Sequence, residues 1–294
     1  MKTLSLLLTA LRPDQWIKNA FVLIPLVFAK QLFRFQSVLM GLTAVGAFCL
    51  LAGATYLIND IVDLEADRVH PSKKHRPLAS GRISIRTVKW IAILLLGLSL
   101  LLGNCLGRSF LFVLAIYLAI QFLYNLKFKE LPILDIFCVS AGFFLRVIGG
   151  GIAVNVMISN WLIICTISIA MFLTLGKRRS ELAVLGAEKA RLHRKVFEYY
   201  SPHLLDQMIS VVTAVTLLSY MLYCISPQTI DKFQTENLIY TFPFVLYGIF
   251  RYLYLIHKSH QGESPSRVLT SDWQLLVSVV LWGICCVLII YGLI

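Results

Sequence analysis

The chain has 294 residues, of which 58% are hydrophobic and only 14% are charged, and its net charge is +12. A soluble globular domain has roughly a quarter of its residues charged, so this composition excludes one. No polar stretch is long enough to bury a core of its own. We therefore expect a single polytopic membrane domain over residues 1–294.

Apolar stretches long enough to cross a bilayer, about 20 residues each, recur along the whole chain. Residues 1–18 contain Arg12, Asp14 and Lys18 and no small-residue cleavage site, so they predict an amphipathic interfacial segment and not a signal peptide. Nine spanning helices are predicted, at residues 19–36, 39–60, 87–106, 109–126, 132–154, 160–176, 207–225, 238–256 and 273–293.

The Lys and Arg residues are distributed very unequally between the two sides of these spans. With successive loops on alternate sides, 22 of the 27 share the side of the N-terminus, four lie on the other, and Arg146 lies inside the fifth span. Because basic loops stay in the cytoplasm, we expect a cytoplasmic N-terminus, an outside C-terminus and an active site facing the cytoplasm of a bacterial-type plasma membrane. Membrane lipids, and not nucleic acid, are the expected partners of this basic face.

An acidic stretch continues directly from the second predicted span. Asn59, Asp63 and Asp67 are four residues apart, so a continuous helix places them on one face, with Asp60 beside them. Crowded carboxylates repel one another unless a cation neutralises them, and Mg²⁺ prefers such oxygen ligands, often together with substrate phosphates. The stretch predicts a magnesium site; a solvated helix end with incidental acids is the alternative.

A basic segment, residues 70–82, follows the acidic stretch. Pro71, Pro77 and Gly81 interrupt helix formation, so a loop beside the carboxylates is predicted. Its Lys and Arg side chains suit phosphate oxygens that a metal does not reach, although ordinary membrane-surface charges have the same composition. Carboxylates next to these cations predict a site for a phosphorylated or diphosphate substrate.

The acidic and basic stretches together resemble the first motif of the UbiA prenyltransferase superfamily. The resemblance lies in Asn59-Asp60-x-x-Asp63-x-x-x-Asp67 and in Arg76-Pro77-Leu78-x-Ser80-Gly81. It implies an all-α integral membrane bundle of about nine transmembrane helices around a laterally open cavity. It also implies Mg²⁺ and a diphosphate substrate.

The loop after the sixth span departs from most of the superfamily. Most members transfer a prenyl group to an aromatic or quinone precursor and have a second acidic motif there, D-x-x-x-D, whereas this chain reads Gly176-Lys-Arg-Arg-Ser-Glu-Leu182. Such a loop removes a carboxylate clamp from a metal-bound diphosphate and offers cations to a bare phosphate. It resembles the decaprenyl-phosphate phosphoribosyltransferase branch, as do Leu11–Asn19, Tyr124–Lys127, Asp135, Phe144–Arg146, Phe250–Tyr252 and Asp272.

The second resemblance implies a transfer of a 5-phosphoribosyl group from 5-phosphoribosyl 1-diphosphate to a polyprenyl (decaprenyl-type) phosphate. Two alternatives stay open: a prenyltransferase with an aromatic or quinone acceptor, and a non-catalytic transporter or lipid-binding protein. A transporter explains Arg146 inside the membrane but not the acidic stretch joined to a basic loop. The oligomeric state is open, and a homo-oligomer is compatible with the sequence.

The expected site residues form two groups. Asp60, Asp63 and Asp67 are expected to bind Mg²⁺ and to be the catalytic group. The alternative role of Tyr56 is an interfacial anchor, and that of Arg146 is an ion pair with an acid of another helix. The group expected to bind the donor or the lipid phosphate comprises Lys18, Tyr56, Asn59, Lys73, Arg76, Lys127, Arg146, Lys177 and Arg178.

Overall fold

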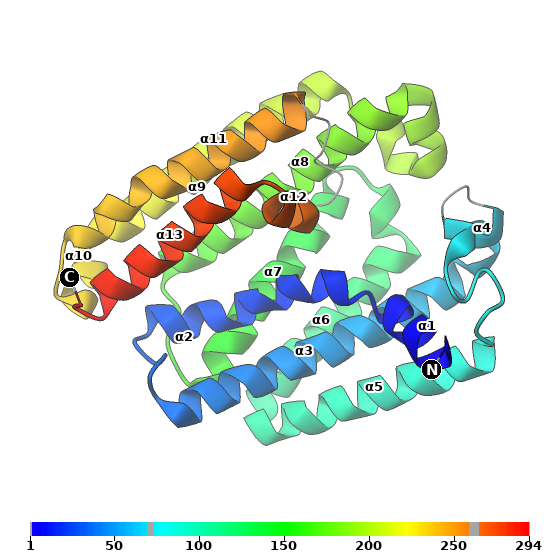
Figure 1. Cartoon of the computed structure of the whole chain (residues 1–294), viewed down its shortest axis with the longest axis horizontal. Helices are drawn as coiled ribbons and strands as arrows, with labels where there is room; N and C mark the ends of the chain where they lie inside the picture. The colour runs from blue at the N-terminus through cyan, green and yellow to red at the C-terminus, as the bar shows by residue number, and fades with distance from the viewer. Residues whose placement is uncertain (1, 70–72, 259–264, 294) are drawn as a thin grey trace. The chain divides into compact units, whose positions relative to one another are not determined.

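The chain is helical in the part that the structure describes. The computed structural model describes residues 2–69, 73–258 and 265–293, and no strand occurs among them (Figure 1). Eight helices within these residues are long and apolar enough to cross a membrane. The predicted all-α integral membrane fold is thereby confirmed.

The long helices alternate with short helical segments at their ends. In chain order the elements are α1 (Lys2–Leu11), the 3-10 helix η1 (Pro13–Leu23), α2 (Ile24–Phe28), α3 (Phe35–Val62), α4 (Leu64–Val69), η2 (Lys73–His75), α5 (Ile85–Leu106), α6 (Arg108–Leu126), η3 (Phe128–Glu130), α7 (Leu134–Ala153), α8 (Asn160–His193), η4 (Lys195–Glu198), α9 (Pro202–Ile225), α10 (Pro227–Phe233), η5 (Asn237–Thr241), α11 (Phe242–Lys258), α12 (Pro265–Ser271) and α13 (Trp273–Ile290).

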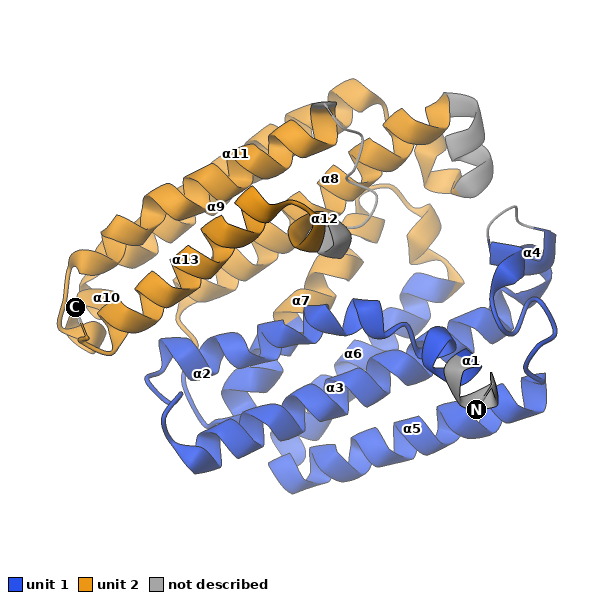
Figure 2. Cartoon of the chain, viewed as in Figure 1, with its two compact units in different colours: residues 1–125, 145–157 blue, residues 126–144, 158–294 orange. Residues whose placement is uncertain are grey.

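The helices form two compact units, coloured separately in Figure 2. Unit 1 comprises residues 1–125 and 145–157, and unit 2 comprises residues 126–144 and 158–294. Helix α7 begins in unit 2 and ends in unit 1, so each unit is described by its own packing. The single domain expected over the whole chain stays a prediction.

The first predicted span, residues 19–36, is not one continuous α-helix. The chain forms η1 and then the five-residue α2, and it turns at Lys30, whose φ is +56°. Pro25, in the first turn of α2, has no N–H with which to continue a helix from η1. A 3-10 helix rises about 2.0 Å per residue and an α-helix about 1.5 Å, so Pro13–Phe28 extends over roughly 30 Å, the thickness of the hydrocarbon core. An irregular segment of this length can supply the ninth predicted crossing.

Unit 1 is built on α3, which packs along α5 and against η1. Small residues on the buried face of α3, including Ala44, Ala47 and Gly53, let neighbouring backbones approach closely. Where η1 passes the second half of α7, the backbone of Val22 lies directly against Gly150, and a Cβ atom at Gly150 would overlap the Val22 carbonyl. The packing of η1 on α3 holds the N-terminal segment against the helix that carries the acidic stretch, and the contact of Val22 with Gly150 holds it against α7.

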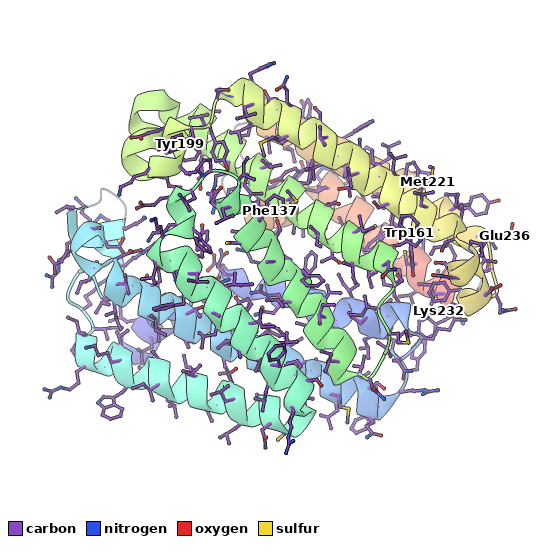
Figure 3. The ribbon with its side chains drawn as sticks, turned by 180° about the vertical axis from the view of Figure 1, so that it is seen from behind. Phe137, Trp161, Tyr199, Met221, Lys232 and Glu236 are labelled. Atoms are coloured by element: carbon purple, nitrogen blue, oxygen red, sulfur yellow. The ribbon has the colours of Figure 1, made fainter. Side chains whose placement is uncertain are left out.

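Unit 2 packs α8, α9, α11 and α13 around a core that includes Phe172, Leu205 and Ile256. Figure 3 shows Tyr199 near one end of this unit and Lys232 and Glu236 near the opposite end. These residues belong to two loops that the alternating topology assigns to opposite sides of the membrane, and the arrangement agrees with that topology. Which end faces the cytoplasm stays a prediction.

Candidate active site

The acidic stretch lies where α3 ends. The spacing predicted one helix that continues through Asp67, and this prediction was wrong. Helix α3 stops just before Asp63, and α4 starts just after it. Backbone hydrogen bonds still bridge the break, from Asp63 N to Asn59 O at 2.9 Å and from Asp67 N to Asp63 O at 2.8 Å. Asp67 therefore stays close to the end of α3, and both Asp60 and Asp67 are buried.

Two arginines neutralise the buried carboxylates. Arg76 Nη1 donates to Asp67 Oδ2 at 2.5 Å and to Asp60 Oδ1 at 3.1 Å. Arg12 Nη2 donates to the same oxygen of Asp60 at 2.5 Å. The carboxylate side chains are 5% and 3% exposed, whereas the two arginine side chains are 25% and 26% exposed. The buried charges are thus paired, as burial requires, and one face of each arginine remains accessible.

Tyr56 lies one helical turn before Asp60 and supports Arg12. The guanidinium carbon of Arg12 is 4.9 Å from the centroid of the Tyr56 ring, which is within the range of a cation–π interaction. The guanidinium is therefore held between an aromatic ring and a carboxylate. Neither of the roles expected for Tyr56 anticipated this contact.

The oxygen atoms at the end of α3 suit a hard divalent cation. Asp60 Oδ1 and Asp67 Oδ2 already converge on one cationic nitrogen, and Asn59 Oδ1 is buried without a hydrogen-bond partner. A buried oxygen without a partner is costly, and a metal ion or a ligand hydroxyl would satisfy it. Among the described residues, no three His, Cys, Asp or Glu side chains are grouped to hold one metal ion. The expected role of Asp63 as a metal ligand therefore stays a prediction.

Two further predicted residues, Lys73 and Lys18, belong to unit 1, and both are half-buried. Lys73 begins η2, and its carbonyl accepts the N–H of Arg76 at 2.9 Å. The loop therefore turns back toward the carboxylates within four residues. Lys18 lies in η1, six residues after Arg12.

Arg146 lies in a separate buried network of unit 1. Its side chain donates from Nε to Asn19 Oδ1 at 2.7 Å and from Nη2 to Tyr117 OH at 3.0 Å. The guanidinium also lies 5.0 Å from the centroid of the Tyr117 ring, and the residue is 4% exposed. These contacts tie η1 to α6 and α7, so Arg146 fixes the N-terminal segment whether or not it binds phosphate.

The cations predicted in unit 2 have unequal surroundings. Arg178 is 3% exposed and is bonded to two carboxylates, Asp135 Oδ2 at 3.0 Å and Glu181 Oε2 at 3.2 Å. Such a buried guanidinium joins α7 to α8, and its predicted role in substrate binding stays a prediction. Lys177 lies 3.6 Å from Glu181 and its side chain is 35% exposed, and Lys127 is exposed at the start of η3. Lys177 and Lys127 therefore remain candidates for phosphate binding.

Arg12 is a site residue that the sequence analysis did not select. It is separated from Asp60 by 48 positions, so no local spacing relates the two residues. The signal in the sequence is a charged residue immediately before a proline, between an apolar helix and the first span. The structure adds that the backbone of Arg12 is in the left-handed region, with a φ of +52°.

The fold and the site define a class of protein: a polytopic α-helical membrane protein with buried, arginine-paired carboxylates at the end of a spanning helix. Exposed apolar side chains on the outer helices, such as Trp90 (67%) and Phe112 (69%), are typical of contact with lipid. The chain belongs to the UbiA prenyltransferase family, whose sequence model matches residues 20–275.

Individual relatives resemble almost the whole chain. A protein of Corynebacterium glutamicum named decaprenyl-phosphate phosphoribosyltransferase is 33% identical and covers 97% of this chain and 86% of its own length. A protein of Mycolicibacterium smegmatis with the same name is 32% identical over 94% of this chain and 89% of its own length. A UbiA homolog from Archaeoglobus fulgidus, solved with GPP and Mg²⁺, aligns with a TM-score of 0.71 at 20% identity and covers 96% of this chain and 99% of its own.

Proposed function

We propose that this protein transfers a 5-phosphoribosyl group from 5-phosphoribosyl 1-diphosphate to a polyprenyl phosphate and releases diphosphate. The observation that carries the proposal is the 33% identity to a decaprenyl-phosphate phosphoribosyltransferase over 97% of the chain. The segment Gly176–Leu182 supports it, because it has three consecutive cations where the resemblance to most of the superfamily implies a second acidic motif. We further propose that the site faces the cytoplasm, where the phosphoribosyl donor is soluble and the basic loops are expected.

Asp60, Asp67 and Asn59 are proposed to hold Mg²⁺, with Asp63 as a further ligand directly or through water. When bound, the ion would supply charge neutralisation for the leaving diphosphate. Arg76 and Lys73, on the adjacent loop, are proposed to bind donor phosphate oxygens. Planar guanidinium and ammonium groups are suited to this, since charge-assisted hydrogen bonds to phosphate are strong.

The lipid phosphate is proposed to be the nucleophile. Its oxygen forms a bond to ribose C1 while the bond from C1 to the diphosphate breaks, so the diphosphate leaves with the bonding electron pair. The attacking oxygen is already anionic, and no general base is required. Positioning and electrostatic stabilisation can therefore supply most of the rate. Lys18, on η1, is proposed to bind the lipid phosphate or the 5-phosphate of the donor. The roles of Lys127, Arg146, Lys177 and Arg178 in phosphate binding stay predictions.

A donor test separates this function from prenyl transfer. Purified protein in detergent receives Mg²⁺ and polyprenyl phosphate with labelled phosphoribosyl diphosphate, or labelled prenyl diphosphate with hydroxybenzoate and naphthoate. We expect label to enter lipid only from the phosphoribosyl donor, and Asp60→Asn to abolish the transfer. Glu65→Gln is the matched control, because Glu65 lies in the same stretch but is 82% exposed and pairs with Arg68. Prenylation of an aromatic acceptor would instead establish the alternative function.

A further inference from the structure

We infer that Arg12 is a mobile counter-ion of the metal site, which pairs with Asp60 and transfers its guanidinium to a diphosphate oxygen when metal and diphosphate bind together. This inference rests on the proposed function only in taking a metal-bound diphosphate as the ligand. A prenyl diphosphate would satisfy the same chemistry. It adds to the site a residue 48 positions away from Asp60 in the sequence.

The first observation is that Arg12 and a metal would compete for one atom. Asp60 Oδ1 accepts hydrogen bonds from both Arg12 and Arg76, at 2.5 Å and 3.1 Å. Its side chain is only 5% exposed, so the carboxylate needs cationic partners at all times. A divalent ion that binds this oxygen supplies the same charge and makes the Arg12 contact dispensable.

The second observation is that the Arg12 guanidinium is partly accessible to a ligand outside the buried site. Its side chain is 25% exposed although Asp60 is buried, and its guanidinium lies over the Tyr56 ring at 4.9 Å. An arginine has five N–H donors arranged in a planar fork that matches phosphate oxygens. Stacking on Tyr56 restrains the plane of the guanidinium while leaving its edge available for a second acceptor.

The third observation is the backbone of Arg12. Its φ of 52° and ψ of 62° lie in the left-handed region, which residues other than glycine seldom adopt. The residue connects α1 to η1, with its N–H bonded to Thr9 O at 3.3 Å and its carbonyl bonded to Gln15 N at 2.9 Å. Such conformations occur at ligand-binding and switch positions, and here the unusual turn directs the side chain toward the end of α3.

Charge balance gives the direction of the exchange. Asp60 and Asp67 are paired with Arg12 and Arg76, and Asp63 is a third carboxylate close to Asp60. Metal binding alone adds positive charge to a site that already contains two guanidinium groups, whereas diphosphate adds negative charge for those groups to pair with. Arg12 therefore opposes metal binding by itself and favours the binding of metal together with diphosphate.

The test measures these two effects separately, without turnover. Mn²⁺ binding to the full-length protein in detergent is followed by electron paramagnetic resonance, with Mn²⁺ alone and with inorganic diphosphate present. For Arg12→Gln we expect Mn²⁺ alone to bind roughly tenfold more tightly, because one positive charge at hydrogen-bond distance changes the affinity of a carboxylate for a proton by about this factor. With diphosphate, we expect binding to weaken by roughly tenfold or more, as for the loss of a charged hydrogen bond. Arg68→Gln is the matched control, since Arg68 pairs with exposed Glu65, and it should change neither value.

The outcomes decide the inference whether or not the proposed reaction is correct. If Arg12→Gln weakens both kinds of binding, or changes neither, Arg12 is a structural residue and the exchange is rejected. Should Arg12→Gln not fold, Arg12→Lys replaces it: the ammonium can still pair with Asp60, so Mn²⁺ alone should bind as in the wild type while binding with diphosphate weakens. Failure of the proposed function would appear in the donor test, and inorganic diphosphate would still report on Arg12.

Discussion

Asp135 Oδ2 lies 3.0 Å from Arg178 Nε, and both side chains are almost completely buried in unit 2. The other oxygen of Asp135 accepts a hydrogen bond from Tyr200 OH at 2.7 Å. The same hydroxyl accepts the N–H of Ile133 at 2.6 Å, and Ile133 has a φ of +68°, which is a strained conformation for a β-branched residue. The network therefore joins the start of α7, the middle of α8 and the segment before α9.

Removal of Arg178 is expected to destabilise the protein strongly. Arg178→Met leaves the carboxylates of Asp135 and Glu181 buried without their shared cation, and the expected loss is about 3–5 kcal/mol. Thermal unfolding in detergent measures it. Glu130→Gln is the control, because it removes the ion pair with Lys195. The side chains of Lys195 and Glu130 are 72% and 40% exposed, so the substitution should cost less than about 1 kcal/mol. Equal losses for both variants would show that the buried network does not hold unit 2 together.

Two buried tyrosines of unit 2 are expected to respond differently to loss of the hydroxyl group. Burial raises the pKa of Tyr200, so the phenol stays protonated and donates to Asp135. Tyr200→Phe removes that bond and the acceptor of Ile133 N–H, at an expected cost of about 1–3 kcal/mol. The hydroxyl of Tyr252 is buried without a partner and faces Gly176, so Tyr252→Phe should be neutral or slightly stabilising. If Tyr252→Phe instead lowers the unfolding midpoint as much as Tyr200→Phe, its hydroxyl has a partner that this arrangement does not include.

The long spans could be predicted because hydrophobicity alone determines them. Helix α3 runs from Phe35 to Val62 and was predicted at residues 39–60, since a lipid environment requires an unbroken apolar helix with all backbone groups bonded. The segment before α3 could not be predicted in this way. Its hydropathy resembles that of a span, but its 3-10 geometry depends on tertiary contacts such as the close approach of Val22 to Gly150.

The candidate site could be predicted only in part. Carboxylates beside an apolar span indicate a neutralising positive charge, and Asp60 and Asp67 are both paired with Arg76 Nη1; Mg²⁺ binding by these residues stays a prediction. A sequence does not show which cation neutralises which acid, because the partners are remote. Arg178 was assigned to phosphate from its neighbours in the chain, yet its acceptor Asp135 lies 43 positions away.

Packing of the N-terminal segment should be sensitive to a single methyl group. Gly150→Ala places a Cβ atom on the Val22 carbonyl, and backbone cannot move aside as a flexible side chain can. We expect a loss of about 1–3 kcal/mol or more and lower transferase activity, since η1 also carries Lys18 and follows Arg12. Gly97→Ala is the control in α5, because nothing lies within 4 Å of a Cβ atom there, and it should be neutral or stabilising by up to about 1 kcal/mol. Similar stability of both variants would contradict the close approach of η1 and α7.

The pair of Arg251 and Asp272 should make stability depend on pH in the acid range. Arg251 Nη2 and Nε bond the two oxygens of Asp272 at 2.7 Å and 3.1 Å, and this contact holds the pKa of Asp272 below its ordinary value of 3.8. Because the unfolded chain then takes up the proton first, the pair stabilises the fold fully above about pH 4, and the contribution is lost as pH falls through the lower folded pKa.

Asp272→Asn isolates that contribution. Asp272 also caps α13 by accepting the N–H of Leu275 at 2.8 Å, and asparagine caps a helix equally well, so the substitution removes the charge and keeps the cap. We expect the variant to unfold at a lower temperature than the wild type at pH 7, and the difference to shrink as pH is lowered below about 4. Asp231→Asn, at an exposed position of α10, should show no such difference at any pH. A gap between Asp272→Asn and the wild type that persists unchanged below the folded pKa would mean that the stabilisation comes from the shape of the side chain and not from its charge.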